Sequence, residues 1–217
     1  MKSALAEAVG TALLLAAVVG SGIMGERLAD GNVAIALLAN STATGCALAA
    51  LIVALAPVSG AHFNPLVTAA LALRGALPRR QILPYVLAQF AGALLGVLLA
   101  HAMFELPLIQ VSTQPRTGAG QWVSEVVATF GLVVLVLSCK RQRSAAAPFA
   151  IGAYIAAAYW FTASTSFANP AVTIARAFTD TFAGIDPAHV AAFIAAQIIG
   201  AAAALLAFSR SSSQSGR

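Results

Sequence analysis

Long apolar stretches, separated by short polar or charged ones, run along most of this chain. Four stretches contain no charged residue at all: 31–73, 81–104, 144–175 and 187–209. An α-helix needs about 20 apolar residues to cross the hydrocarbon core of a bilayer, so each stretch has room for one or two crossings. The pattern predicts six membrane-spanning helices, near residues 4–24, 33–57, 83–104, 122–139, 147–165 and 188–208.

Composition supports a membrane protein. Of the 217 residues, 60% are hydrophobic and 9% are charged, whereas a soluble domain has about 25% charged residues. The fold class that follows is an all-α membrane protein. Cys46 and Cys139 lie in predicted spans without metal or redox spacing, and we interpret both as small packing residues.

Six spans would divide the loops between the two sides of the membrane, and lysine and arginine are unevenly distributed between these sides. With the N-terminus inside, three lie outside, Arg27, Arg116 and Arg176. The other nine lie inside: Lys2, Arg74, Arg79, Arg80, Lys140, Arg141, Arg143, Arg210 and Arg217. This positive-inside bias predicts a multi-pass protein with both termini cytoplasmic. The net charge of +5 is explained by orientation, and no basic surface for nucleic acid is visible. Short termini and alanine-rich helices favour a prokaryotic plasma membrane.

The first residues also have the basic start and apolar middle of a signal peptide. We expect the segment to be retained, because Glu7 within it matches a residue of a repeat. Three segment pairs occur in the same order: Glu7–Thr11 with Glu125–Thr129, Phe63–Thr68 with Ala168–Thr173, and Ala88–Ala93 with Ala196–Ala201. Such ordered matches indicate a duplication, with repeat one near 1–104, repeat two near 122–209, and a disordered tail at 210–217. The whole chain, 1–217, is expected to form one transmembrane domain.

Two apolar pieces remain, 64–74 and 169–177, each headed by Asn-Pro and too short to cross the bilayer. Each repeat has an odd number of full spans, so the second copy begins on the opposite side of the membrane, and the topology is inverted. The two pieces are therefore expected to enter from opposite faces as re-entrant half-helices. They would meet N-terminus to N-terminus at mid-membrane.

Asparagine and proline suit the start of a half-helix. Asn64 and Asn169 can cap with their side-chain oxygens, while Pro65 and Pro170 occupy the first helical position. The NH₂ group of each asparagine should then be free to face a pore. Glu7 and Glu125 are expected to support the re-entrant loops by accepting hydrogen bonds from backbone N–H groups. A proton-relay role is the alternative for these two carboxylates.

With these motifs and the segment "SGAHFNPLVTAALA", the sequence resembles the major intrinsic protein family, the aquaporins and aquaglyceroporins, over essentially its whole length. The resemblance implies a right-handed six-helix bundle with two half-helices, one pore per subunit and a homotetramer. It also implies a pore midplane and a pore-lining histidine. Their residues would be Asn64, Pro65, Leu66, Asn169, Pro170 and Ala171 at the midplane, with His62 as the histidine.

The sequence departs from the family pattern at two places. Leu66 stands where alanine is usual, and Val172 stands where the family usually has the arginine of its narrowest constriction. Counting from the asparagines places the other filter positions at Thr44, Ala157 and Ser166. These four residues predict a wide, uncharged ring. Arg176, one turn beyond Val172, cannot occupy the same position, although it could restore part of the positive charge at the mouth.

The function that follows is passive permeation of water and small neutral solutes: glycerol-like polyols, or metalloid hydroxides such as arsenous acid. Leu66, Val172 and Ile174 would form the apolar side of the pore. Without the family's arginine, exclusion of cations should be weaker but not abolished. The alternatives are a proton-coupled secondary transporter using Glu7, Glu125 and His62, and an ion channel. The motifs give no indication of an enzyme, a metal site or a cofactor.

Overall fold

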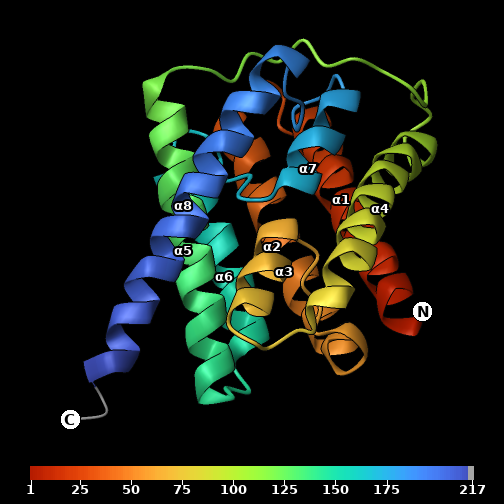
Figure 1. Cartoon of the computed structure of the whole chain (residues 1–217). Helices are drawn as coiled ribbons and strands as arrows, with labels where there is room; N and C mark the ends of the chain where they lie inside the picture. Colours follow the sequence, from red (N-terminus) through yellow and green to blue (C-terminus); the bar gives the residue numbers. More distant parts are fainter. Residues whose placement is uncertain (215–217) are drawn as a thin grey trace.

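All regular structure in the described residues, 1–214, of this computed structural model is helical (Figure 1). The first repeat contains α1 (Lys2–Leu28), α2 (Val33–Ser59), α3 (Pro65–Leu73) and α4 (Ile82–Met103). The second contains α5 (Ala119–Gln142), α6 (Ala147–Phe161), α7 (Pro170–Ala175) and α8 (Pro187–Gln214). Short 3₁₀ turns, η1 (Arg79–Gln81) and η2 (Arg176–Phe178), follow the two half-helices. The expected all-α architecture with two re-entrant half-helices is confirmed.

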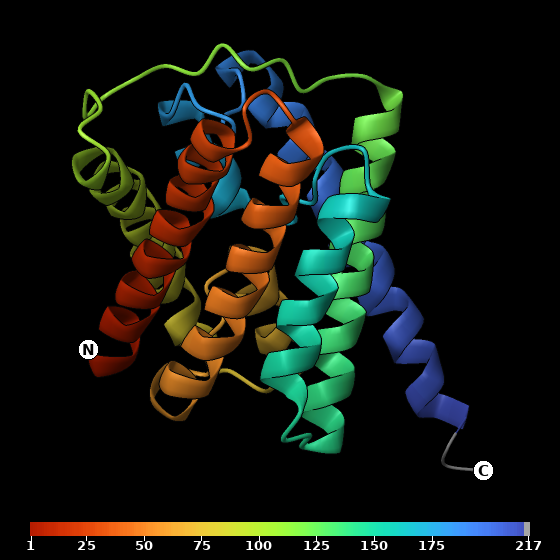
Figure 2. The same ribbon diagram turned by 180° about the vertical axis from the view of Figure 1, so that it is seen from behind.

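The bundle has two chemically different ends. Residues 104–118 cross one of them as the longest connection, and we call this the long-loop end (Figure 2). The opposite end carries the α3–η1 and α5–α6 connections with their arginines and lysines, and we call it the basic end. The half-helix α3 lies toward the basic end and α7 toward the long-loop end (Figure 1). The two half-helices therefore enter the bundle from opposite sides.

Five helices are long and apolar enough to cross a membrane: α1, α2, α4 with η1, α5 and α8. The sixth, α6, has only 15 residues, or about 22 Å at 1.5 Å per residue. We predicted a span through residue 165, but the helix ends at Phe161, and the chain then turns back into the bundle. At the other boundary α8 continues to Gln214, so 210–214 are helical where a disordered tail was expected. Residues 215–217 of that tail lie outside the described residues.

Glycines allow close helix crossings in both repeats. A Cβ added at Gly92 or Gly96 of α4 would overlap carbonyl oxygens of α1, and one at Gly200 of α8 would overlap the carbonyl oxygen of Val126 in α5. Small residues at these positions bring the helix backbones together, as is common between membrane helices. The tight α1–α4 and α5–α8 pairs fix the frame on which the re-entrant loops rest.

Both half-helices begin as their sequences predict. The Oδ1 atom of Asn64 accepts a hydrogen bond from Leu66 N at 2.9 Å, and that of Asn169 accepts from Ala171 N at 3.0 Å. Both asparagines have extended backbone, and a proline follows each at the start of the helix. Because a proline has no N–H to lose there, the two short helices can start abruptly in the middle of the bundle.

Candidate pore and selectivity filter

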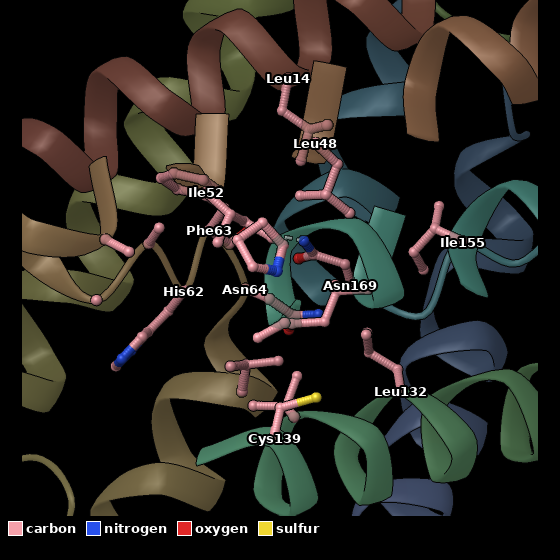
Figure 3. Close-up of a pocket in the computed structure, with 18 of the residues that line it drawn as sticks. Leu14, Leu48, Ile52, His62, Phe63, Asn64, Leu132, Cys139, Ile155 and Asn169 are labelled. Atoms are coloured by element: carbon pink, nitrogen blue, oxygen red, sulfur yellow. Dashed lines mark hydrogen bonds between the residues drawn. The ribbon is translucent and has the colours of Figure 1, made fainter. Parts of the chain in front are cut away.

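A cavity of about 870 Å³ runs through the bundle from the basic end past both half-helix starts (Figure 3). Its basic-end lining includes Lys140 and Arg143, and its middle is lined by His62, Asn64 and Asn169. Toward the long-loop end the lining contains five side chains that we call the filter cluster. They are Thr44, Tyr159, Ser166, Val172 and Arg176.

The two asparagines lie side by side in the middle of the cavity, surrounded by Leu48, Leu132 and Ile155 (Figure 3). Asn64 Nδ2 donates to the Ala168 carbonyl oxygen at 2.8 Å, and Asn169 Nδ2 donates to the Phe63 carbonyl oxygen at the same distance. Each amide therefore locks onto the other half's loop, a contact that the sequence did not predict. An NH₂ group has two protons, so one N–H of each asparagine remains for the cavity.

Glu7 holds the first re-entrant loop. Its Oε1 accepts from Ser59 Oγ at 2.6 Å and His62 N at 3.0 Å, and its Oε2 accepts from Phe63 N at 2.7 Å and Gln89 Nε2 at 2.8 Å. The side chain is fully buried. Four hydrogen bonds use all the lone-pair sites of a carboxylate. The carboxylate thus satisfies loop N–H groups that have no helical partner.

Glu125 repeats this arrangement at the second loop. Its Oε1 accepts from Ser164 Oγ at 2.6 Å and Phe167 N at 2.9 Å, while its Oε2 accepts from Ala168 N at 2.9 Å and Gln197 Nε2 at 2.6 Å. The two glutamines also donate to matching threonines, Gln89 to Thr68 and Gln197 to Thr173. The inverted repeat therefore extends to individual hydrogen bonds.

His62 lines the cavity near the first half-helix. Its Nδ1 lies 3.1 Å from Thr68 Oγ1, and its ring packs against Tyr85 with centroids 5.3 Å apart. These contacts orient the imidazole at the cavity wall. His101, by contrast, is fully buried away from the cavity, and its ring nitrogens lie 2.9 Å from Leu108 O and 2.8 Å from Thr179 Oγ1.

The apolar wall differs from the expected one. Val172 lines the cavity, but Leu66 and Ile174 are not among its lining residues, and neither are Pro65, Pro170 and Ala171. Both prolines and Ala171 are buried in the packing that surrounds the half-helices. The wall is instead formed by larger aliphatic residues of the spanning helices and α3. Examples are Leu14, Val18, Leu48, Ile52, Val67, Leu71, Leu132 and Ile155.

One filter residue was placed on the wrong face of its helix. Ala157 is exposed on the side of α6 that faces away from the cavity, and α6 lines the cavity with Ile151, Ile155 and Tyr159 instead. Counting twelve residues back from Asn169 gave Ala157, but a helix turns by 100° per residue, so an error of two residues reverses the face. The spacing of Ile151, Ile155 and Tyr159, four residues apart, was the signal that could have identified Tyr159.

The filter cluster is neither uncharged nor free of aromatic groups, in contrast to the predicted ring. Tyr159 donates from its hydroxyl to Thr44 Oγ1 at 3.3 Å. Arg176 is only 2% exposed, lines the cavity and hydrogen bonds through Nε to the Ala183 carbonyl oxygen. The Ser166 hydroxyl is buried without a hydrogen-bond partner in the described residues. The cluster thus offers a guanidinium and an unpaired hydroxyl next to the apolar Val172.

No group of three or more His, Cys, Asp or Glu side chains that could hold a metal ion occurs among the described residues. The charged side chains of the cavity wall are Lys140, Arg143 and Arg176, all of them cations. The chemistry available is hydrogen bonding opposite an aliphatic wall.

Membrane-crossing helices, an inverted repeat and two half-helices that meet at a central cavity define a helical membrane channel. Comparisons with known proteins agree. Residues 1–166 match the family model described as major intrinsic protein. The chain is 55% identical to the aquaglyceroporin AqpS of Rhizobium meliloti over 200 residues, covering 92% of this chain and 85% of that protein. It is 32% identical to a probable aquaporin AqpM of Archaeoglobus fulgidus, with 92% of each chain covered.

A solved structure shares the fold. The X-ray structure of the aquaglyceroporin from Plasmodium falciparum superposes with a TM-score of 0.71 at 18% identity, covering 94% of this chain and 93% of that one. The chain belongs to the major intrinsic protein family. It is accordingly a channel and not an enzyme, and the proton-coupled transporter that we considered as an alternative finds no support in the comparisons.

Proposed function

We propose that the cavity is a passive path for water and small neutral solutes that carry several hydroxyl groups, such as glycerol. The observation that carries this proposal is the two-sided lining of the cavity. Asn64, Asn169, Ser166 and Thr44 supply hydrogen-bonding groups along the path, while aliphatic side chains cover the remaining wall. A polyol that loses water on entry can regain hydrogen bonds on one side and place its carbon backbone against the other.

Metalloid hydroxides such as arsenous acid are included in the proposed substrate class. At neutral pH they are small uncharged molecules with three hydroxyl groups, the same hydrogen-bonding inventory as glycerol. Val172, at the position of the family's usual arginine, leaves that place apolar and uncharged. The relative named as an aquaglyceroporin, at 55% identity, supports the polyol class as a whole.

The hydrogen bonds of Glu7 and Glu125 argue for passive flow. Every lone-pair site of both carboxylates is occupied by a loop donor, so binding a proton would break a bond that holds the loop. Neither carboxylate lines the cavity. Proton-driven transport through these groups would therefore disrupt the re-entrant loops at each cycle.

Orientation and assembly are part of the proposal. The nine-to-three distribution of Lys and Arg supports an orientation with the basic end and both termini in the cytoplasm of a prokaryotic cell. The long-loop end then faces outward. A homotetramer with one pore in each subunit follows from the family resemblance, and large apolar side chains exposed on the outer helix surfaces are available for contacts with lipid or with neighbouring subunits.

The test is stopped-flow light scattering on proteoliposomes that contain the wild-type protein, Val172→Arg or Val172→Met. Water, glycerol and arsenous acid are measured with and without a pH gradient. We expect wild-type flux of all three, unaffected by the gradient. Arginine at 172 should lower glycerol and arsenous acid flux by about tenfold or more and spare water, because a charged, hydrated side chain would enter the path.

Val172→Met is the matched control, since it adds length without charge or a strong hydrogen-bonding group. A smaller loss of solute flux with methionine than with arginine would assign the effect to the guanidinium. Solute uptake that required a proton gradient would contradict passive permeation and make Glu7 and Glu125 the residues to examine.

A further inference from the structure

The 104–118 connection is fixed across the long-loop end of the bundle by hydrogen bonds along its length. Ser112 N donates to the Ala177 carbonyl oxygen at 2.9 Å, and Asp186 N donates to the Gln114 carbonyl oxygen at 2.8 Å. Asp180 Oδ1 accepts from the backbone N and the hydroxyl of Thr113. These bonds attach the connection to the segment that follows α7, directly beside the filter cluster.

Arg116 joins this connection to the loops beside the filter cluster. Its Nε donates to the Gly184 carbonyl oxygen at 2.6 Å, and its Nη2 donates to the Phe182 carbonyl oxygen at 3.2 Å. Its Nη1 lies 3.4 Å from Ser164 O and 3.3 Å from Thr165 Oγ1, immediately before the filter residue Ser166. One guanidinium thus joins three segments: the connection itself, the loop before α7 and the loop before α8.

Arg116 and Arg176 share an aromatic partner. The guanidinium carbon of Arg176 lies 3.4 Å from the centroid of the Phe167 ring, and that of Arg116 lies 5.0 Å from the same centroid. Phe167 lines the cavity, follows Ser166 and is held from behind by an edge contact with Phe193. The ring therefore holds both cations close to the filter cluster.

Neither guanidinium forms an ion pair among the described residues, although the Glu125 carboxylate acts on both from a greater distance. In residues 1–214 no carboxylate oxygen lies within ion-pair distance of Arg116 or Arg176, and all their hydrogen bonds go to neutral acceptors. Burial lowers the pKa of Arg116, but a guanidinium still keeps its proton at neutral pH. Arg176 is among the cavity-lining residues, whereas Arg116 is not and belongs to the 104–118 connection at the long-loop end.

We infer that Arg116 and Arg176 together form a two-cation barrier at the long-loop mouth that excludes cations and protons while neutral solutes pass. Arg176 presents its charge in the path. Arg116 adds a second charge from outside and positions Phe167, and through it Arg176. The barrier replaces the charge missing at Val172 and leaves that part of the filter apolar, so cation exclusion is strong where the sequence predicted it to be weak. The inference rests on the proposed channel function.

Its test measures two quantities on the same proteoliposomes: glycerol flux, and proton influx reported by a trapped pH-sensitive dye under an imposed potassium diffusion potential. The variants are Arg116→Gln, Arg176→Gln and Arg116→Lys. We expect each glutamine variant to raise proton leak roughly tenfold or more, since a unit charge within several ångströms acts strongly at low dielectric. Lysine at 116 keeps the positive charge but lacks the planar guanidinium with its several donors. Proton leak in Arg116→Lys should therefore stay much closer to wild type than in Arg116→Gln.

Arg27→Gln is the matched control. Arg27 lies at the same end, donates to the Phe104 carbonyl oxygen at 3.3 Å and stacks on that ring at 5.2 Å, but it is exposed and does not contact Phe167 or the loop before Ser166. It should leave proton leak unchanged. Unchanged leak in both glutamine variants, or equal leak in Arg27→Gln, overturns the inference. Lysine and glutamine behaving alike at 116 overturns the charge role of Arg116.

Retained glycerol flux shows that a variant is folded. Arg176 is buried, so Arg176→Gln can fail to fold. In that case the comparison of Arg116→Gln with Arg116→Lys decides the inference. Wild-type vesicles without glycerol flux would contradict the proposed function instead, so the two failures are distinguishable.

Discussion

The two re-entrant loops share a scaffold and differ in what they present to the path. In each, one buried glutamate accepts bonds from a serine, two loop N–H groups and a glutamine, and each asparagine bonds the other loop. Yet the first loop places His62 at the cavity wall, where the second places Phe167, with Arg176 stacked on its ring. The repeat therefore determines the frame of hydrogen bonds that holds the two loops, whereas selectivity arises where the two copies have diverged.

The divergence matches the two ends of the cavity. At the basic end the cavity is bordered by Lys140 and Arg143 on the α5–α6 side. At the long-loop end the 104–118 connection, which has no counterpart of equal length in the first repeat, brings Arg116 over the mouth. Substitutions in the shared frame should therefore act alike on both halves, and substitutions in the diverged part should act mainly on permeation.

The largest effect is expected from removing the carboxylates. Glu7→Ala and Glu125→Ala each leave four buried donors without an acceptor. At about 1–3 kcal/mol for each unsatisfied group, the loss of stability should reach about 4 kcal/mol or more. Thermal unfolding in detergent would show this as a large fall in Tm, of similar size in both variants, with loss of flux.

Glu26→Ala is the control for this prediction, because Glu26 is exposed on α1 and should be replaceable with little change in Tm. A strong effect at one buried glutamate and none at the other would contradict the shared frame. Full stability with altered proton dependence of transport would instead support the relay role that we considered for these groups.

A smaller effect is expected at the glycine crossings. Gly96→Ala would push a Cβ into the Ala12 carbonyl oxygen of α1, and Gly200→Ala would do the same at Val126 of α5. Overpacking of this kind costs about 1–3 kcal/mol. Tm should fall in both variants, whereas Gly120→Ala, with open space around its Cβ position, should leave Tm unchanged or slightly raised. An unchanged Tm in Gly200→Ala would show that α5 and α8 can move apart at their crossing, whereas α1 and α4 cannot.

The frame could be predicted from the sequence because its signals are local or periodic. Charge-free stretches gave the spans, Asn-Pro gave the half-helix starts, and ordered matches of Glu7 with Glu125 gave the repeat. Each of these signals either involves only a few neighbouring residues or recurs at intervals along the chain. The loop-supporting role of the two carboxylates could also be predicted from the repeat, and the structure contains the hydrogen bonds that such a role requires.

The diverged part could not be predicted in the same way. Ala157 was chosen by counting across a helix end and an irregular segment in which Thr165, Ser166 and Ala168 have positive φ, and counting cannot fix the helical face there. Arg116 lies in a connection without periodicity, 51 residues before Phe167 along the chain. Its place at the mouth depends on carbonyl groups of two other loops, a tertiary arrangement that no local pattern encodes.

The smallest effect, and the most direct probe of the filter cluster, is expected from Tyr159→Phe. The change removes only the hydroxyl that bonds Thr44 Oγ1 at 3.3 Å, and a hydrogen bond of this kind contributes about 0.5–1.5 kcal/mol. Thr44 is then free to hydrogen bond a passing solute, so glycerol flux should change by a few-fold at most.

Tyr154→Phe is the matched control. Its hydroxyl bonds the Ala128 carbonyl oxygen at 3.0 Å, and the side chain is not among the cavity-lining residues, so it should cost similar stability and leave flux unchanged. Equal flux changes in the two variants would show that α6 affects permeation through its packing and not through Tyr159 in the filter.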